Sequence, residues 1–392
     1  MPFIVAVVLN LLLDWLIMRK LRRSPRGGKW KSRLHLVLTV ALTALLVVIV
    51  ALPVRQVGNG QMHLVMWLIF TYFAFYLPKY FALLVWLPGL LPCFAARGKR
   101  VFTHAATVVG VLLFAVLWWG ALVNPYRTQV RRVDLSFSNL PASFEGYRIV
   151  HFSDAHLGTY NGDTAFVARY VKEMNDLRPD VICFTGDLVN RQTSEAEPFV
   201  KVLSRLRARD GVFSVLGNHD YDDYMQWPAE AQKLADRAAL VALQRKAGWD
   251  LLNDEHRAIV RGTDTIMIIG TENVGDPPFP VYGDLHRAYP TPTDSLFKVM
   301  LQHNPYAWRQ DLLKNSNIAL TLSGHTHAMQ MMLTVLGRDY SPAAWRYGEW
   351  CGAYHEGEQV LYVNIGIGMV GFPARLGSAL PEITVITLHK KK

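Results

Sequence analysis

The stretch YRIVHFSDAH, residues 147–156, joins a β-type run to two side chains that can bind a metal ion. Residues 147–152 have the composition of a strand, and the polar residues Ser153 and Asp154 end it. Asp154 and His156 are two positions apart, so both side chains can point to one side of an extended chain. The stretch therefore predicts a strand with an oxygen and a nitrogen ligand at its carboxyl end.

The same arrangement recurs at four later points of the chain, where an apolar run stops and a metal-binding type of residue follows. These clusters are Gly186-Asp187, Gly217-Asn218-His219-Asp220, His303 and Gly324-His325-Thr326-His327. Strand-like runs lie at 133–137, 147–152, 181–185, 212–216, 266–269, 297–301, 318–322, 360–364 and 383–388, and helical patterns at 165–177, 198–209 and 229–246. Because loops at the carboxyl ends of strands in α/β sheets converge on one edge, we expect the clusters to form one pocket.

The predicted ligand set suits two adjacent divalent metal ions, which together can clamp a phosphate ester. Asp187 can bridge both ions through its two oxygens, and Asn218 offers a neutral oxygen that limits the negative charge. Nitrogen and oxygen ligands without sulfur favour Mn, Fe or Zn. The predicted ligands are Asp154, His156, Asp187, Asn218, His303, His325 and His327.

His219 and Asp220 are the predicted catalytic residues. His219 is expected to stay a free imidazole that protonates the leaving oxygen or stabilises the developing charge. Asp220 is expected to orient His219 or another group beside the metals. Each cluster alone is weak, since Asp-x-His and Gly-Asp are common in turns, so the prediction rests on the whole ordered series.

Residues 1–123 predict a membrane domain, and 124–146 a junction to a catalytic domain at 147–392. Apolar runs lie at about 3–18, 34–54, 64–95 and 104–123, and a run of about 20 residues can cross the hydrocarbon core. The third run contains Pro78 and Lys79. We interpret it as one kinked span in which Lys79 faces protein or snorkels; a helical hairpin is the alternative and would change the parity.

Charge predicts the orientation of these spans. Residues 1–123 carry 13 Lys and Arg and one acid, Asp14, whereas 124–392 carry 28 basic and 30 acidic residues. The basic loops, 19–33 (including Arg26) and 96–103, are predicted to be cytoplasmic. Four spans then predict an integral protein of a bacterial cytoplasmic (inner) membrane with an extracytoplasmic catalytic domain. The slightly acidic second half gives no reason to expect nucleic acid.

The three cysteines exclude a disulfide framework, and none has the spacing of a zinc site. Cys183 lies in an apolar run and is expected to pack in the core. No role is assigned to Cys351.

The ordered motifs resemble the calcineurin-like metallophosphoesterase superfamily, and especially its transmembrane members. The resemblance covers about 147–389 and includes Gly217-Asn218-His219-Asp220-Tyr221, His303-Asn304-Pro305 and Pro373-Ala374-Arg375. It implies a four-layer α/β/β/α sandwich, preceded here by the membrane helices. One metal would be held by Asp154, His156, Asp187 and His327, and the other by Asp187, Asn218, His303 and His325.

The resemblance also implies a mechanism in which a metal-bridging hydroxide attacks phosphorus in line, with His219 as acid or charge stabiliser. Asn218 and Arg375 would contact the substrate phosphate; for Arg375 a lipid head group or a surface salt bridge are the alternatives. The chain departs from the pattern at Ala328-Met329-Gln330, where many relatives have Gly-Gly-Gln, and at Asn190, where Asp is frequent. Neither departure touches a predicted ligand, so both bear on substrate choice.

The predicted function is a membrane-anchored hydrolase of a phosphodiester or pyrophosphate bond, with the bilayer and a lipid-linked or envelope phosphoester as partners. Related proteins include enzymes that cleave the UDP-linked diacylglucosamine precursor of lipid A. The alternatives are a phosphomonoesterase or phosphoprotein phosphatase, a nuclease, or a non-catalytic membrane scaffold. The scaffold is disfavoured because every ligand and His219 are present, and no protein partner can be inferred.

Overall fold

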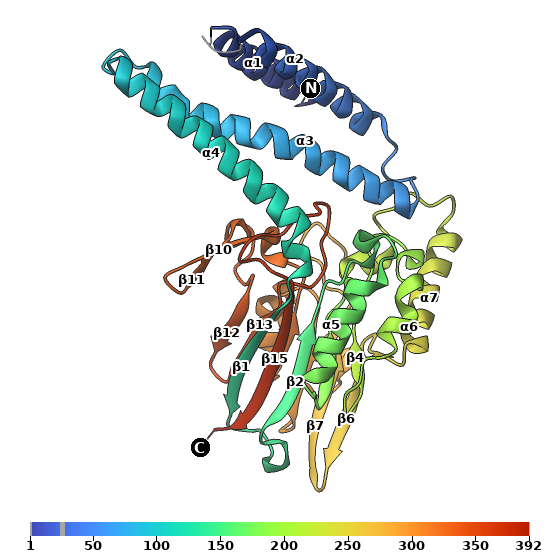
Figure 1. The fold of residues 1–392 in the computed structure, drawn as a ribbon. Coiled ribbons are helices and arrows are strands. Elements are labelled where there is room, and N and C mark those ends of the chain that lie inside the picture. Colours follow the sequence, from blue (N-terminus) through green and yellow to red (C-terminus); the bar gives the residue numbers. More distant parts are fainter. Residues whose placement is uncertain (1, 24–27, 392) are drawn as a thin grey trace. The chain divides into compact units, whose positions relative to one another are not determined.

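The computed structural model describes residues 2–23 and 28–391, so Arg26 of the predicted basic loop lies outside the described residues. The chain divides into two compact units, Met1–Trp119 and Gly120–Lys392 (Figure 1). Each unit has a hydrophobic core of its own. The division falls within the last membrane helix, because its final residues pack with the catalytic domain.

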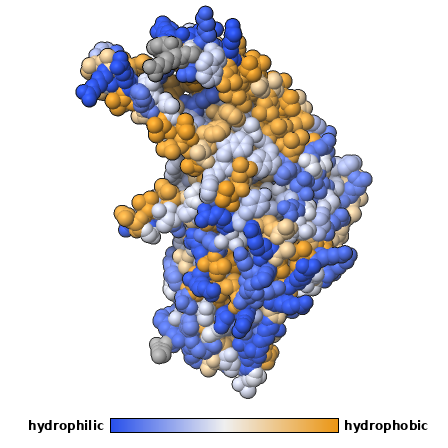
Figure 2. All heavy atoms as spheres, viewed as in Figure 1, coloured by the Kyte–Doolittle hydropathy of each residue, from blue (hydrophilic) through white to orange (hydrophobic). Residues whose placement is uncertain are grey.

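The first unit is built from helices α1 (Pro2–Arg22), α2 (Gly28–Ala51), α3 (Asn59–Trp86) and α4 (Ala96–Leu122). Pro78 lies inside α3, so the third apolar run is one helix and the hairpin alternative is wrong. Three described segments are long and apolar enough to cross a membrane: Gly28–Ala51, Asn59–Leu90 and Ala96–Tyr126. A crossing by α1, which contains Asn10 and Asp14, stays a prediction. Hydrophobic residues gather over the helices in Figure 2.

Of the two predicted alternatives for Lys79, the structure shows that it faces protein, because it pairs with Asp14. Its Nζ lies 2.7 Å from Asp14 Oδ1, while the Tyr76 hydroxyl donates to Asp14 Oδ2 at 2.9 Å. His35 Nε2 lies 3.3 Å from the same carboxylate, of which only 1% is exposed. An unpaired charge inside a bilayer is costly, so this network ties α1, α2 and α3 together.

The second unit contains two large sheets and one small one. The first has the order β1 (Gln129–Phe137), β15 (Glu382–Lys390), β2 (Tyr147–Phe152), β3 (Val181–Phe184), β4 (Val212–Ser214), β5 (Asp250–Leu251). The second has the order β12 (Gly352–Glu356), β13 (Gln359–Val363), β9 (Leu320–Ser323), β8 (Phe297–Leu301), β7 (Asp264–Gly270), β6 (Glu255–Arg261). Strands β11 (Arg338–Tyr340), β10 (Met331–Val335) and β14 (Leu376–Gly377) form the small sheet.

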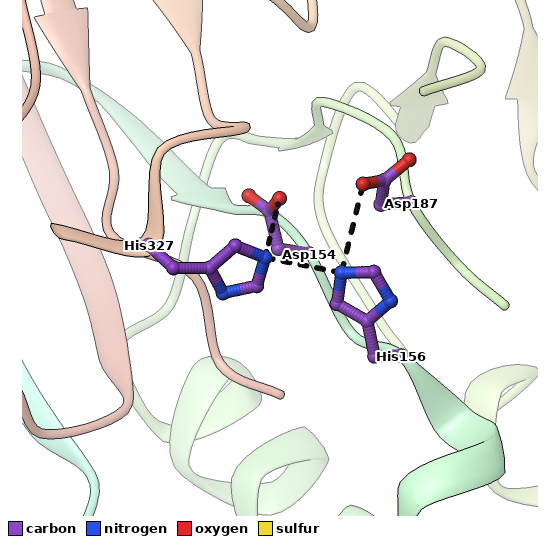
Figure 3. Close-up of side chains that lie close together, drawn as sticks. All are labelled: Asp154, His156, Asp187 and His327. Carbon is purple, nitrogen blue, oxygen red and sulfur yellow. Dashed lines mark hydrogen bonds and ion pairs between the residues drawn. The ribbon is translucent and has the colours of Figure 1, made fainter. Parts of the chain in front are cut away.

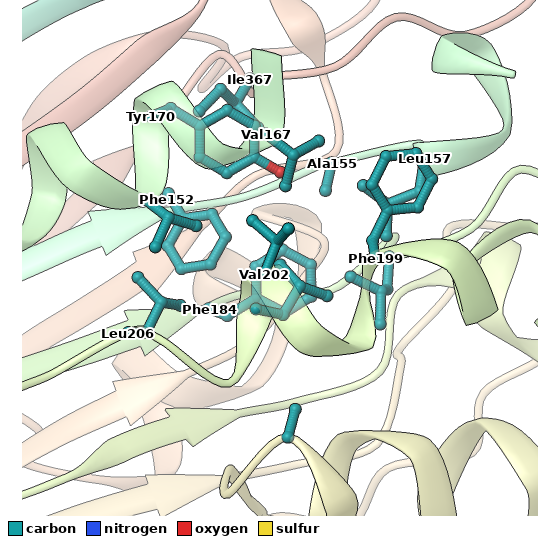
Figure 4. Close-up of a cluster of buried hydrophobic side chains, with 14 of the residues drawn as sticks. Phe152, Ala155, Leu157, Val167, Tyr170, Phe184, Phe199, Val202, Leu206 and Ile367 are labelled. Carbon is teal, nitrogen blue, oxygen red and sulfur yellow. The ribbon is translucent and has the colours of Figure 1, made fainter. Parts of the chain in front are cut away.

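Three separate cores confirm the predicted four-layer α/β/β/α arrangement. One packs helices α5 (Thr164–Asp176), α6 (Val200–Leu203) and α7 (Glu230–Lys246) on the first sheet (Figure 4). A second fills the space between the two sheets and includes Cys183, which is buried as predicted. The third covers the outer face of the second sheet with α8 (Leu285–Ala288) and the turn at Trp308–Leu312.

Local sequence explains helix α5 but does not explain the short length of α6. Asp163 caps α5 by accepting a hydrogen bond from Ala165 N at 2.9 Å, and Phe166, Tyr170 and Met174 are buried one turn apart. The predicted helix at 198–209 is wrong in length, because α6 has only four residues. After it, hydrogen bonds from Arg205 N to Val202 O and from Leu206 N to Leu203 O span three residues, which tightens the chain out of the α-helix.

The nine predicted strands are all present, and β1 lies at the edge of the first sheet. The strands that the sequence analysis missed include β6, β10, β11 and β12, which are largely exposed. The apolar residues of β6, β11 and β12 do not form the continuous runs by which the buried strands were recognised, whereas β10 is apolar but was not recognised as a strand.

Candidate metal centre

Five loops bring the seven predicted ligands together. Asp154 and His156 follow β2, Asp187 follows β3 and Asn218 follows β4, and these strands are parallel neighbours in the first sheet. His303 follows β8, and His325 and His327 follow β9, its parallel neighbour in the second sheet. The carboxyl ends of both sheets therefore face one site, as the sequence predicts.

A first ligand group contains Asp154, His156, Asp187 and His327, whose donor atoms all lie within 4.8 Å of one another (Figure 3). The Nε2 atoms of His156 and His327 are 3.0 Å apart. His327 Nε2 lies 3.1 Å from Asp154 Oδ1, and His156 Nε2 lies 3.5 Å from Asp187 Oδ2. All four side chains are buried, so solvent does not separate them.

A second group adjoins the first. Asn218 Oδ1 lies 3.1 Å from His303 Nε2 and 2.9 Å from His325 Nδ1. Asp187 Oδ2, which borders the first group, is also 3.3 Å from His303 Nε2. One carboxylate oxygen thus reaches both groups, which is the position that a bridging ligand requires.

The donor set of these residues fits a metal ion. His303 Nδ1 lies 2.6 Å from the Thr185 carbonyl, to which it donates, so a neutral ring turns its Nε2 lone pair toward two oxygen acceptors. Lone pairs that face one another in this way are stabilised by a cation between them. Burial alone would lower the pKa of His303, but the charges of Asp187 and Asp154 raise this pKa to about 9, so the ring would carry a proton at Nε2 unless a metal ion takes the place of that proton. The site therefore attracts positive charge.

The backbone at the site is strained. Asp154, His156, Asp187, His325 and His327 have φ values of 52°, 42°, 59°, 73° and 49°. Residues with a Cβ rarely adopt this left-handed backbone region, and each residue that does so lowers the folding stability by about 1–3 kcal/mol. Residues of this kind cluster at functional sites, where the surrounding structure holds them.

At two glycines of these loops, no side chain would fit beside the ligands. A Cβ on Gly324 would overlap Ser153 and the carboxylate of Asp154, and a Cβ on Gly217 would overlap the carboxylate of Asp187. Larger residues at these positions would displace the ligands.

His219 lies beside both groups without joining either. Its Nδ1 is 2.7 Å from the Asn190 carbonyl, to which it donates, and its backbone N–H donates to Asp187 Oδ1 at 2.8 Å. The ring lies 4.9 Å from that of His156 and stacks on Tyr224 at 4.0 Å. The hydrogen bonds of His219 therefore use its Nδ1 and its backbone N–H.

Asp220 does not have the position of a catalytic residue. It is fully buried, and the hydrogen bonds found for it within the described part of the chain come from backbone N–H groups. Its Oδ2 accepts from Asp187 at 2.8 Å and Gly217 at 2.9 Å, and its Oδ1 accepts from Leu188 at 2.9 Å and Val189 at 3.2 Å. Asp220 therefore orients the loop that carries Asp187, rather than the His219 ring.

The expectation that Arg375 reaches a substrate, a lipid or a surface carboxylate is corrected by the structure. Its side chain is fully buried, and its guanidinium donates to the backbone carbonyls of Gly368, Ile365, Gly366 and Ala379. A cation gathers these carbonyls because each has partial negative charge. Arg375 thus holds the loop that passes behind Asp154 and His327.

Tyr224 and Tyr347 are the site residues that the sequence analysis missed. The Tyr224 hydroxyl accepts a hydrogen bond from Asn218 Nδ2 at 2.8 Å, and the Tyr347 ring meets His325 edge to face at 5.7 Å. Tyr224 is only six positions after Asn218, but no spacing rule singles it out.

The departures from the family pattern also have places in the structure. Ala328, Met329 and Gln330 form a left-handed turn with φ values of 49°, 48° and 55°, a conformation that two glycines would adopt without strain. Asn190 supplies the carbonyl that accepts from His219.

Comparison with known proteins agrees with this geometry. Residues 147–329 match the family described as calcineurin-like phosphoesterase, and residues 1–125 match the transmembrane domain of probable calcineurin-like phosphoesterases. An uncharacterized metallophosphoesterase of Bacillus subtilis is 31% identical over 68% of this chain and 87% of its own length. The chain belongs to the calcineurin-like metallophosphoesterases with a transmembrane domain. It is an integral membrane protein and a metal-dependent phosphoesterase.

Two further relatives have informative names. A transmembrane protein with metallophosphoesterase domain from Danio rerio is 32% identical over 72% of this chain, which spans 63% of that relative's length. The UDP-2,3-diacylglucosamine pyrophosphatase of Chlamydia trachomatis is 27% identical over 67% of this chain and 91% of its own.

Proposed function

We propose that this metallophosphoesterase uses two divalent metal ions to hydrolyse a phosphodiester or pyrophosphate bond in a lipid-linked or envelope substrate. The observation that carries the proposal is the place of Asp187 Oδ2, 3.5 Å from His156 Nε2 in one ligand group and 3.3 Å from His303 Nε2 in the other. Two ions, when bound, neutralise charge on the phosphate and activate water. Mn, Fe and Zn all suit the ligands.

In this proposal the residues of the site have separate roles. Asp154, His156, Asp187 and His327 hold one ion, and Asp187, Asn218, His303 and His325 hold the other. The Asn190 carbonyl supports positive charge on His219, since it accepts from Nδ1 at 2.7 Å. His219 then donates a proton from Nε2 to the leaving oxygen, or stabilises the charge that develops there.

The membrane anchor and the named relatives support the substrate class. Attachment to membrane helices favours a substrate in or near the bilayer, and one relative is a pyrophosphatase of a diacylated sugar nucleotide. The basic loops favour a catalytic domain outside the cytoplasm if α1 crosses the membrane. An outward domain favours an envelope or lipid-linked phosphoester over a substrate that is made in the cytoplasm.

Hydrolysis by the full chain in detergent with Mn²⁺ tests the proposal. We would compare a chromogenic phosphodiester with a phosphomonoester, for the natural chain and for Asp187→Ala and His219→Ala. Both variants should lose on the order of 100-fold or more in turnover. Asp187→Ala should also bind less metal, whereas His219→Ala should keep its metal content.

Exposed residues of the same types provide matched controls. Asp176→Ala and His355→Ala change side chains on the surface of the second unit and should leave turnover unchanged. Full metal-dependent activity in Asp187→Ala would contradict the ligand assignment. A higher rate on the monoester would contradict the proposed bond type.

A further inference from the structure

The hairpin of β10 and β11, with the turn Pro342–Trp345 that follows, exposes an unusual amount of apolar surface. Fourteen large hydrophobic residues are exposed in the described chain from Gly120 onward, and seven of them lie between 329 and 345. They are Met329, Met331, Leu333, Val335, Leu336, Tyr340 and Trp345. Figure 2 shows an orange projection where Figure 1 places β10 and β11. A patch this concentrated indicates an interaction surface.

The apolar residues share one face of the hairpin. Leu333 pairs with Tyr340 and Val335 pairs with Arg338, so these side chains point to the same side, whereas the Thr334–Asp339 pair lies on the other. On that other side Met332 is buried in the domain. A hairpin that met only water would present its polar face outward, and this one presents its apolar face.

The turn at the tip of the hairpin also indicates an interaction surface. Leu336 and Gly337 both have positive φ, 50° and 76°, a conformation that favours Asn-Gly. Leucine is poorly suited to it, and here the side chain is 100% exposed. A strained, fully exposed leucine contributes nothing to the fold, so its position indicates contact with something outside the domain.

Contacts within the second unit tie the base of this hairpin to the end of the last membrane span. Gly120 and Asn124 lie inside the candidate span Ala96–Tyr126. The Gly120 carbonyl accepts from Arg375 N at 2.8 Å, and Asn124 Nδ2 donates to the Arg375 carbonyl at 2.8 Å. Leu376, the next residue, pairs with Met331 at the start of β10. The hairpin therefore begins beside the end of this candidate span.

The hairpin is also connected directly to the metal centre. The left-handed turn His327–Gln330 begins at a predicted ligand and leads directly into β10. The tip at Leu336 is five residues beyond Met331, a reach of roughly 16 Å for a strand. The element thus connects the site to whatever the tip contacts.

We propose that the hairpin 331–340, together with Trp345, inserts its apolar face into the lipid headgroup region and so keeps the metal centre facing lipid phosphates. The bilayer is the favoured occupant because the base of the hairpin is tied to a membrane span. Tryptophan and tyrosine are also typical of membrane interfaces, and the exposed Arg338 complements phosphate charge. The lipid-linked nature of the substrate rests on the proposed function, whereas the insertion of the hairpin into the membrane does not.

Site-specific labelling tests the insertion without any need for activity. The full chain, with Cys93→Ser and Cys351→Ser, is reconstituted in phosphatidylcholine–phosphatidylglycerol vesicles and carries an environment-sensitive fluorophore at Leu336→Cys. Cys183 is fully buried and stays. A label at Val260→Cys is the matched control, since Val260 is 62% exposed on β6, far along the chain from the hairpin. Brominated acyl chains and aqueous iodide serve as quenchers.

We expect brominated lipid to quench the label at 336 several-fold more than the label at 260, and iodide to show the reverse. Equal access of iodide to both labels would overturn the proposal. Shielding of the label at 336 from both quenchers would overturn it as well, because it would mean that another protein surface covers the hairpin.

A second measurement tests the link to the substrate. Leu336→Asn suits the turn better than leucine does, so folding is preserved while the apolar tip is lost; Leu336→Met keeps the apolar tip as a control. Leu336→Asn should lower hydrolysis of a vesicle-embedded lipid phosphodiester several-fold relative to a soluble diester. An unchanged ratio would overturn this part. If no variant hydrolysed either substrate, the proposed function would fail while the labelling result still decided the insertion.

Discussion

At the scale of single residues, the carboxamide of Asn218 depends on Tyr224. Its Nδ2 donates to the Tyr224 hydroxyl at 2.8 Å, which turns Oδ1 toward His303 and His325. Tyr224→Phe removes the acceptor but keeps the ring that stacks on His219. We expect Mn²⁺ affinity to fall about 10-fold, the effect typical of partners that orient ligands. A metal titration of activity, with the exposed Tyr126→Phe as control, checks this; equal affinities of Tyr224→Phe and the natural chain would show that Asn218 is held by other contacts.

His151 should make the domain sensitive to acid. Burial lowers its pKa to about 3, while its Nε2 lies 2.9 Å from the Thr185 hydroxyl. The unfolded chain has a histidine pKa near 6.5, so between pH 6.5 and 3 it binds more protons than the folded chain. Stability is therefore complete above about pH 6.5 and is lost as the pH falls toward the folded pKa.

The expected loss of folding stability due to His151 is about 1.4 kcal/mol at pH 5.5, one unit below the pKa of the unfolded chain. His151→Gln keeps a hydrogen-bonding group without this titration. Between pH 7.5 and 5.5 the free energy of unfolding should fall in both proteins, and the fall should be about 1.4 kcal/mol larger for the natural chain than for the variant. Denaturant titrations of both proteins at the two pH values measure the difference, and parallel losses would rule out His151 as the cause.

At the scale of secondary-structure elements, Asp14 and Lys79 join α1 to α3. Removing one partner leaves a buried charge unpaired, which costs about 3–5 kcal/mol, whereas removing both costs much less. We therefore expect Lys79→Met to destabilise the helical unit strongly, and Asp14→Leu to restore much of the loss in the double variant. Unfolding in mixed micelles measures this, with the exposed Lys99→Met as control. Strictly additive losses would mean that the ion pair is not the link.

At the scale of the whole molecule, the number of membrane crossings decides which side of the membrane the metal centre faces. If α1 crosses the bilayer together with the three longer apolar helices, the chain crosses four times and the basic loops stay in the cytoplasm. A periplasmic alkaline phosphatase reporter fused after Lys392 should then be active, and the same reporter fused after Arg100 should be inactive. Activity in the opposite pattern would place the catalytic domain in the cytoplasm and favour a substrate made there.

Much of the fold was predictable because its signals are local. Each buried strand is a short apolar run, and each ligand stands directly after one, so 147–156 already contains both a strand and a pair of ligands. The exposed strands lack the pattern of a buried strand: β6 has charged residues at both ends and pairs with β7 in a local hairpin, and β10 is apolar but largely exposed. The hairpin with its outward apolar face could not be recognised before its two faces were assigned.

The sequence by itself determined the fold class, the order of the ligands and the presence of a membrane domain, since these follow from residue type and spacing. Only the tertiary structure decided what each polar side chain does. Asp220 and Arg375 looked like parts of the chemistry, yet one binds the backbone of the Asp187 loop and the other four buried carbonyls. A hydrogen-bond partner is chosen by which distant segments fold against a residue, and the sequence around that residue does not carry this information.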